Sequence, residues 1–135
     1  MTDEISSKDT VAIDETVHEI YKQLTGESSV LTAPFRTMKD VFMWAVCLGV
    51  QQKRRRPLTG KRLPVFRWAQ FDSQVDLPML KAVAIADSGD IDVLLKRNDI
   101  LAIAEEYANA GIHEMRDVVL NGTDQPLWNL VILIS

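Results

Sequence analysis

Residues 37–52 read Thr37-Met-Lys-Asp-Val-Phe-Met-Trp-Ala-Val-Cys-Leu-Gly-Val-Gln-Gln52, and this stretch decides the fold. Thr37 followed by Asp40 predicts a helix N-terminus, because a threonine oxygen can accept from free amides there and a negative charge is favourable. Every residue from Val41 to Leu48 is apolar. A helix that is apolar on all sides is buried. We therefore expect a central helix over about residues 38–52, with Gly49 permitting close packing against a neighbour.

Apolar residues at helical spacing predict further helices around this centre. The predicted segments are residues 10–24, 76–88 and about 98–120, with a short helical turn at 91–95 and a last helix or extended tail at 125–134. The predicted fold class is mainly α, a compact bundle of about five helices. Residues 1–9 are expected to be a disordered N-terminus, and residues 10–135 a single helical domain.

The segment near residues 53–68 interrupts the helical pattern. Pro57 and Pro64 are unfavourable inside a helix, and Thr59-Gly60 could form a turn. We therefore expect a small irregular or β-hairpin excursion here, with residues 56–58 pairing with residues 63–66. Each proline removes a backbone donor, so such strands would be edge strands.

Composition excludes several protein classes. Hydrophobic residues make up 47% of the 135 residues and charged residues 25%, with a net charge of −4, unlike a disordered chain. The single cysteine, Cys47, excludes an intramolecular disulfide and a multi-cysteine zinc site, and its apolar neighbours predict that it is buried. No apolar run approaches the roughly 20 residues that cross a membrane, and the polar, acidic N-terminus is unlike a secretory signal. We expect a cytoplasmic protein without a membrane partner.

Positive charge is concentrated in one part of the chain. Residues 41–71 contain no acidic residue and carry +7, so the rest of the chain carries −11. The predicted nucleic-acid or partner-binding residues are these seven cations: Lys53, Arg54, Arg55, Arg56, Lys61, Arg62 and Arg67. They could contact DNA phosphates, an acidic partner protein or the chain's own acidic helices. Phe66, Trp68 and Phe71 could stack on bases or anchor the segment in the core.

No motif for catalysis, a cofactor or a metal is apparent, so we expect a non-enzymatic protein. His18 and His113 lie on different predicted helices and lack metal-ligand spacing. One alternative is a metal-dependent nuclease-like or nucleotide-processing subunit, which would need the carboxylates of Asp87, Asp90 and Asp92 to converge. Another is a structural homo-oligomer, such as a homodimer, assembled through the apolar tail at residues 127–135.

Several phrases together resemble one known family. They are Tyr21-Lys-Gln-Leu-Thr-Gly26, Phe35-Arg-Thr-Met-Lys-Asp-Val-Phe-Met43, Arg56-Pro-Leu58, Arg67-Trp68 and Glu105-Glu-Tyr-Ala-Asn-Ala-Gly111. In this order and spacing they resemble the Dnd system-associated protein 4 family, over roughly residues 17–130. The resemblance implies an accessory protein of prokaryotic DNA phosphorothioation and phage defence. It implies partners among other defence or DNA-modification proteins, or DNA, and it brings no catalytic residue with it.

Overall fold

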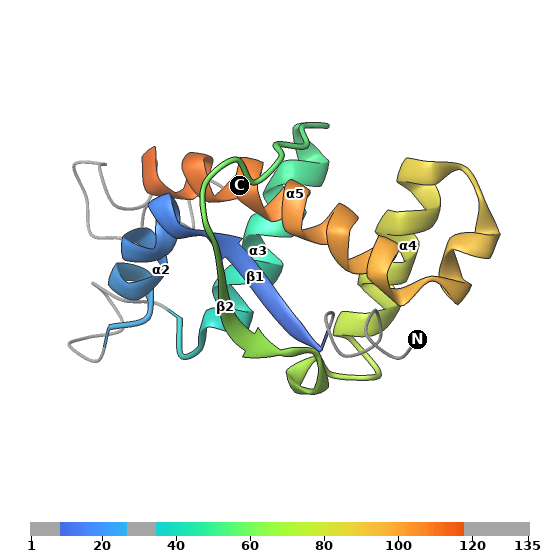
Figure 1. Cartoon of the computed structure of the whole chain (residues 1–135), viewed down its shortest axis with the longest axis horizontal. Coiled ribbons are helices and arrows are strands. Elements are labelled where there is room, and N and C mark those ends of the chain that lie inside the picture. Colours follow the sequence, from blue (N-terminus) through green and yellow to red (C-terminus); the bar gives the residue numbers. More distant parts are fainter. Residues whose placement is uncertain (1–8, 27–34, 118–135) are drawn as a thin grey trace.

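Helix α3 (Met38–Gln51) runs through the middle of the molecule, as its all-round apolar sequence predicts (Figure 1). The structure is a computed structural model that describes residues 9–26 and 35–117. The side chains of Val41, Phe42 and Val46 are completely buried. The predicted capping residue also takes its expected role, because Thr37 Oγ1 accepts a hydrogen bond of 3.2 Å from the Asp40 amide.

Helix α5 (Arg97–Met115) packs closely along α3, and two glycines make the close approach possible. A Cβ atom at Gly49 would collide with the carbonyl oxygen of Tyr107. A Cβ atom at Gly111 would collide in the same way with the carbonyl oxygen of Ala45. Each helix therefore presents a glycine where the backbone of the other passes, which confirms the expectation for Gly49.

Strand β1 (Thr10–Asp14) overturns the prediction of one helix over residues 10–24. The chain forms this strand first, then the 3-10 turn η1 (Glu15–Val17) and the short helix α2 (His18–Leu24). The apolar spacing that predicted a helix lies at Val17, Ile20, Tyr21 and Leu24, so it belongs to η1 and α2 alone. Asp14 separates strand from helix, because its side chain accepts from the Thr16 amide and caps η1.

Strand β2 (Arg62–Arg67) lies in the segment where a hairpin was expected, but its partner is different. It pairs antiparallel with β1, with Thr10 opposite Arg67 and Asp14 opposite Arg62, and the register shifts between Val11 and Ala12. The predicted pairing of residues 56–58 with 63–66 is therefore wrong. The two strands form a two-stranded sheet that packs against α3 and α5 (Figure 1).

The described residues contain four α-helices instead of the expected five. They are α2, α3, α5 and α4 (Asp76–Ser88), which precedes α5 in the chain. Two short 3-10 turns, η2 (Trp68–Gln70) and η3 (Ile91–Leu95), precede and follow α4. The predicted fifth helix or tail at residues 125–134 and the N-terminal residues 1–8 lie outside the described residues. Within residues 9–26 and 35–117, no helix is both long enough and apolar enough to cross a membrane.

Aromatic side chains fix the start of the segment that joins the sheet to α4. Phe66 and Phe71 are buried and meet Phe42 of α3, with ring centroids 5.6 and 6.1 Å away from it. Trp68 and Phe71 form a T-shaped pair with ring centroids 5.4 Å apart, and the guanidinium of Arg97 lies over the Trp68 ring, 5.2 Å from its centroid. Of the two roles considered for these aromatics, the structure therefore supports the core anchor.

Candidate functional site

The basic segment, defined here as residues 53–62, begins where α3 ends. Lys53 adopts a left-handed backbone conformation with φ of 57°. Its amide donates to Val50 O at 3.0 Å, and the Arg54 amide donates to Gly49 O at 2.9 Å. This pair of bonds closes the helix in the pattern usually built around a glycine. It turns the chain sharply, so that the segment crosses over α5 toward β2 (Figure 1).

Helix α5 holds the backbone of the basic segment at its middle. The Arg56 amide donates to Glu106 O at 3.0 Å. The side-chain amide of Asn109 donates to two successive carbonyls, Arg56 O at 3.1 Å and Pro57 O at 3.2 Å. Since Asn109 is buried, these bonds satisfy backbone groups that water cannot reach from that side.

Arg55 is neutralised by carboxylates of the same chain. Its guanidinium pairs with Asp87 of α4 at 2.5 Å and with Glu106 of α5 at 3.0 Å. Tyr107 completes the group by donating its hydroxyl to Asp87 at 2.8 Å. Burial and this bond to Asp87 raise the pKa of Tyr107. Arg55 therefore joins α4 to α5 and leaves little charge for an external anion.

Arg62 is neutralised in a similar way at the other end of the segment. It pairs at 2.5 Å with Glu105, whose carboxylate is buried and also accepts from the Ala12 amide at 2.9 Å. A buried carboxylate is costly unless it is paired and hydrogen-bonded. Arg62 thus satisfies a charge inside the fold.

Asp14 fixes the turn of the segment at Gly60. Its carboxylate accepts from the Gly60 amide at 2.8 Å, and a Cβ atom at Gly60 would lie 2.5 Å from it. The backbone bond from Thr16, followed by that from Gly60, lowers the pKa of Asp14. The Glu15 amide donates to Lys61 O at 2.8 Å and continues the pairing of the strands.

The structure therefore divides the seven predicted contact residues into three groups. Arg55 and Arg62 are exposed but ion-paired to carboxylates of the same chain. Arg67 is exposed, but it lies at the far end of β2, opposite Thr10. The remaining four are exposed on the segment itself and have no ion pair within residues 9–26 and 35–117, and we call them the free cations: Lys53, Arg54, Arg56 and Lys61.

Residues of the phrase Glu105-Glu-Tyr-Ala-Asn109 supply most of this anchoring. Pairing of the arginines with the chain's own acidic helices was one of the alternatives from the sequence, but these particular residues were not predicted. Glu105 and Glu106 point in different directions on α5, as adjacent helical residues do. Each therefore meets a different arginine of the basic segment. The resemblance contained the signal, since this phrase was among those that carry it. No spacing rule connects a helix with a loop that precedes it by about fifty residues.

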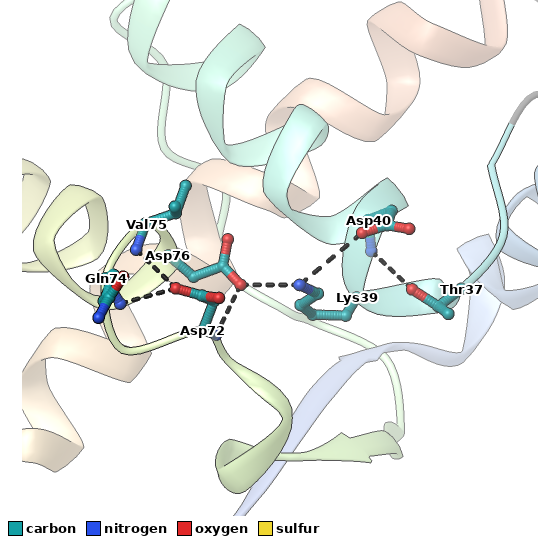
Figure 2. A network of polar contacts seen from close by, with 7 residues as sticks. All are labelled: Thr37, Lys39, Asp40, Asp72, Gln74, Val75 and Asp76. Atoms are coloured by element: carbon teal, nitrogen blue, oxygen red, sulfur yellow. Dashed lines mark hydrogen bonds and ion pairs between the residues drawn. The ribbon is translucent and has the colours of Figure 1, made fainter.

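A second polar network joins the starts of α3 and α4, and Figure 2 shows it from close by. Lys39 donates to Asp76 at 2.8 Å, and Asp76 also accepts from the Asp72 amide at 2.8 Å. The hydrogen bond to Asp76 raises the pKa of Lys39. Asp72 in turn accepts from the amides of Gln74 and Val75 and so shapes the turn before α4. This network fixes two helix starts relative to each other.

Two of the three carboxylates considered for a metal site have other partners. Asp87 binds Arg55 and Tyr107, and Asp90 accepts from the Asp92 amide at the start of η3. In the described part of the chain, no group of three or more histidine, cysteine or acidic residues is arranged to hold a metal ion.

Cys47 corrects one further expectation, because it is exposed and not buried. Its thiol contacts Met79 Sδ at 3.7 Å on the neighbouring helix α4. Desolvation of the thiol raises the pKa of Cys47, which disfavours the reactive thiolate.

Comparison with known proteins gives one match. Residues 11–135 match a family described as DNA sulphur modification system-associated protein 4. Searches of curated proteins and of solved structures gave no match.

Proposed function

Because the chain belongs to the DNA sulphur modification system-associated protein 4 family, we propose that it is a non-enzymatic accessory protein of a phosphorothioation-linked defence system. In this proposal it binds DNA through the free cations of the basic segment. One observation carries the proposal: the four cations stay exposed and unpaired in the described chain, while the segment between them is anchored to α5.

Anchoring matters because it reduces the cost of binding. A loose basic loop loses conformational freedom when it meets a phosphate backbone, whereas a fixed loop has already lost it. The hydrogen bonds from Asn109 and to Glu106 hold the backbone of Arg56 in place before any partner arrives. The ion pairs of Arg55 and Arg62 also fix the segment, so the charge available to a partner comes from the four free cations.

An acidic face of another protein of the same system is the second candidate partner. The observation in its favour is the net charge of −4, which opposes the approach of DNA to the rest of the surface. The same four cations would make the contacts. DNA and an acidic protein differ in how binding depends on salt, because only the DNA contacts release condensed counterions.

The test measures binding to duplex DNA of about 20 base pairs by fluorescence anisotropy over a series of salt concentrations. If four cations contact phosphates, log K should fall against log salt with a slope of about −3.6. A variant with Lys53, Arg54, Arg56 and Lys61 all replaced by glutamine should lose most of this slope and of the affinity.

The matched control removes four other exposed cations by glutamine replacement: Arg36, Arg67, Lys81 and Lys96. It changes the net charge equally and should retain most of the slope. Equal losses in both variants would contradict a specific surface and indicate only a general charge effect. Absence of DNA binding by the wild type at low salt would sink the DNA proposal, and a pull-down from the native host would then test the acidic partner.

A further inference from the structure

A cavity of about 440 Å³ lies between the start of the basic segment and the C-terminal part of α5. Residues 52–56 line one side of it. Ala110, His113, Glu114 and Asp117 line the other side. Three of the four free cations therefore border one hollow next to a histidine, while Lys61 lies further along the segment.

Lys53 occupies its place in this cavity wall at an energetic cost. A left-handed backbone costs a residue other than glycine about 1–2 kcal/mol. Glycine would fit the turn better, since nothing in the turn geometry requires a side chain. A strained residue beside a cavity is a reason to look for a function of its side chain, and here that side chain is a cation.

His113 lies among both positive and negative groups. Desolvation lowers its pKa below the usual value of 6.5, and Arg56 of the basic segment and Arg116, directly after α5, lower it further. Asp117, just beyond the end of α5, and Asp14 of β1 act weakly in the opposite direction. The lysine and arginines of residues 53–55 and Glu114 line the same cavity. The ring is therefore neutral near pH 7 in the free protein.

We propose that this cavity receives a phosphodiester group of the bound DNA, and that His113 takes up a proton from solvent as the phosphate enters. The inference rests on the proposed function, because it assigns one phosphate of the same DNA to this place. A phosphate oxygen beside the ring would offset the arginines and stabilise the imidazolium, which can then donate a hydrogen bond to it.

The sign of the pH dependence follows from this linkage. If the pKa of His113 is higher in the complex than in the free protein, the complex holds more protons between the two pKa values. Affinity for DNA then rises as the pH falls through that interval. The gain is up to tenfold for each unit by which DNA binding raises the pKa of His113. Above both values the histidine is neutral in either state and contributes no pH dependence.

The first experiment follows the ring resonances of both histidines by NMR during a pH titration, in the free protein and with saturating duplex DNA. The pKa of His113 should rise on binding. His18 of α2 is not among the residues that line the cavity, so its ring resonances serve as the internal control.

The second experiment compares DNA affinity at about pH 5.5 and about pH 8 for three proteins. The wild type and His18→Gln should bind several-fold more tightly at the lower pH, whereas the ratio for His113→Gln should fall toward one. DNA binding with an unchanged pKa of His113 would overturn this inference and leave the proposed function intact. Failure of the wild type to bind DNA at any pH would overturn both.

Discussion

Glu105 and Glu106 are adjacent in the sequence and meet different environments in the fold. Glu105 is buried between Arg62 and the Ala12 amide, whereas Glu106 is half-buried and reaches Arg55 at the surface. Adjacent residues on a helix point in different directions, so Glu105 pairs with Arg62 at the start of β2 and Glu106 pairs with Arg55 of the basic segment. At this scale the chemistry of the candidate site depends on which arginines are already satisfied.

His113 should make the stability of the free protein depend on pH. Its folded pKa is lowered, mainly by desolvation, so the unfolded chain binds more protons at mildly acidic pH. Its contribution is complete above about pH 6.5 and is lost as the pH falls toward the folded value. Urea unfolding at several pH values should show a smaller acid loss for His113→Gln than for the wild type. Identical profiles would contradict the assignment.

Lys53→Gly should separate stability from binding. Relief of the left-handed strain should outweigh the extra entropy of an unfolded glycine and raise the free energy of unfolding by roughly 0.5–1 kcal/mol. The same variant removes a cation from the cavity and should weaken DNA binding severalfold. A variant that is both less stable and unchanged in binding would contradict both statements. Urea denaturation and anisotropy give the two measurements.

The crossing of α3 and α5 determines the architecture at the scale of elements. Both helices bring a glycine to the crossing, and the neighbouring carbonyls leave no room for a methyl group. The sheet and α4 then pack on this pair, and the basic segment crosses α5 on the way from α3 to β2 (Figure 1).

Gly111→Ala tests that crossing. An added methyl group in a tightly packed interior typically costs about 1–3 kcal/mol, and here it meets a backbone carbonyl that cannot rotate away. Gly89→Ala is a useful comparison, because a Cβ atom there meets nothing within 4 Å and only the left-handed φ of 71° opposes it. Gly111→Ala should lower the unfolding free energy by clearly more than Gly89→Ala does. Equal effects would argue against the close crossing.

Asn109→Ala tests the anchoring of the basic segment. It removes two hydrogen bonds to the carbonyls of Arg56 and Pro57 and should cost about 1–3 kcal/mol. Hydrogen exchange at residues 54–58 should accelerate more than exchange elsewhere, and DNA affinity should fall because the segment must be ordered on binding. Asn109→Asp should be worse still near neutral pH, since it turns a carboxylate toward the same carbonyl oxygens. Unchanged exchange at these residues would contradict the anchor.

At the scale of the whole molecule, β1 joins the N-terminal part of the chain to its centre. Val11 and Ile13 are buried in the core, and the strand supplies the entire partner of β2. Deletion of residues 1–14 should therefore abolish cooperative thermal unfolding, as followed by circular dichroism. A truncated chain that still melts cooperatively near the wild-type temperature would show that β1 is dispensable.

Local sequence patterns predicted the helices well and the long-range pairing poorly. The cap at Thr37, the all-round apolar run after it and the glycine at residue 49 are local signals, and each has its expected consequence in α3. Strand β1 is only five residues long and lies shortly before a helix, so the helix predicted over residues 10–24 included its residues. Its partner is about fifty residues away, and no local rule specifies such a pairing.

The candidate site was predicted only in part, because its charge is a local pattern whereas its ion pairs are long-range contacts. The density of positive charge identified the basic segment, but the sequence could not show which arginines form ion pairs with carboxylates of the same chain. Arg55 and Arg62 are satisfied by carboxylates on α4 and α5, whose approach depends on tertiary packing.

The bond from the Ala12 amide to Glu105 spans 93 residues of the chain and has a consequence for biosynthesis. On the ribosome, β1 is made before the other described elements, and its carboxylate partner lies on α5, the last described helix. Until Glu105 has been translated, the Ala12 amide lacks its native acceptor and β1 cannot settle on α5. The native contact between β1 and α5 therefore forms only after α5 has been synthesised, so the first described strand reaches its final environment only once the last described helix exists.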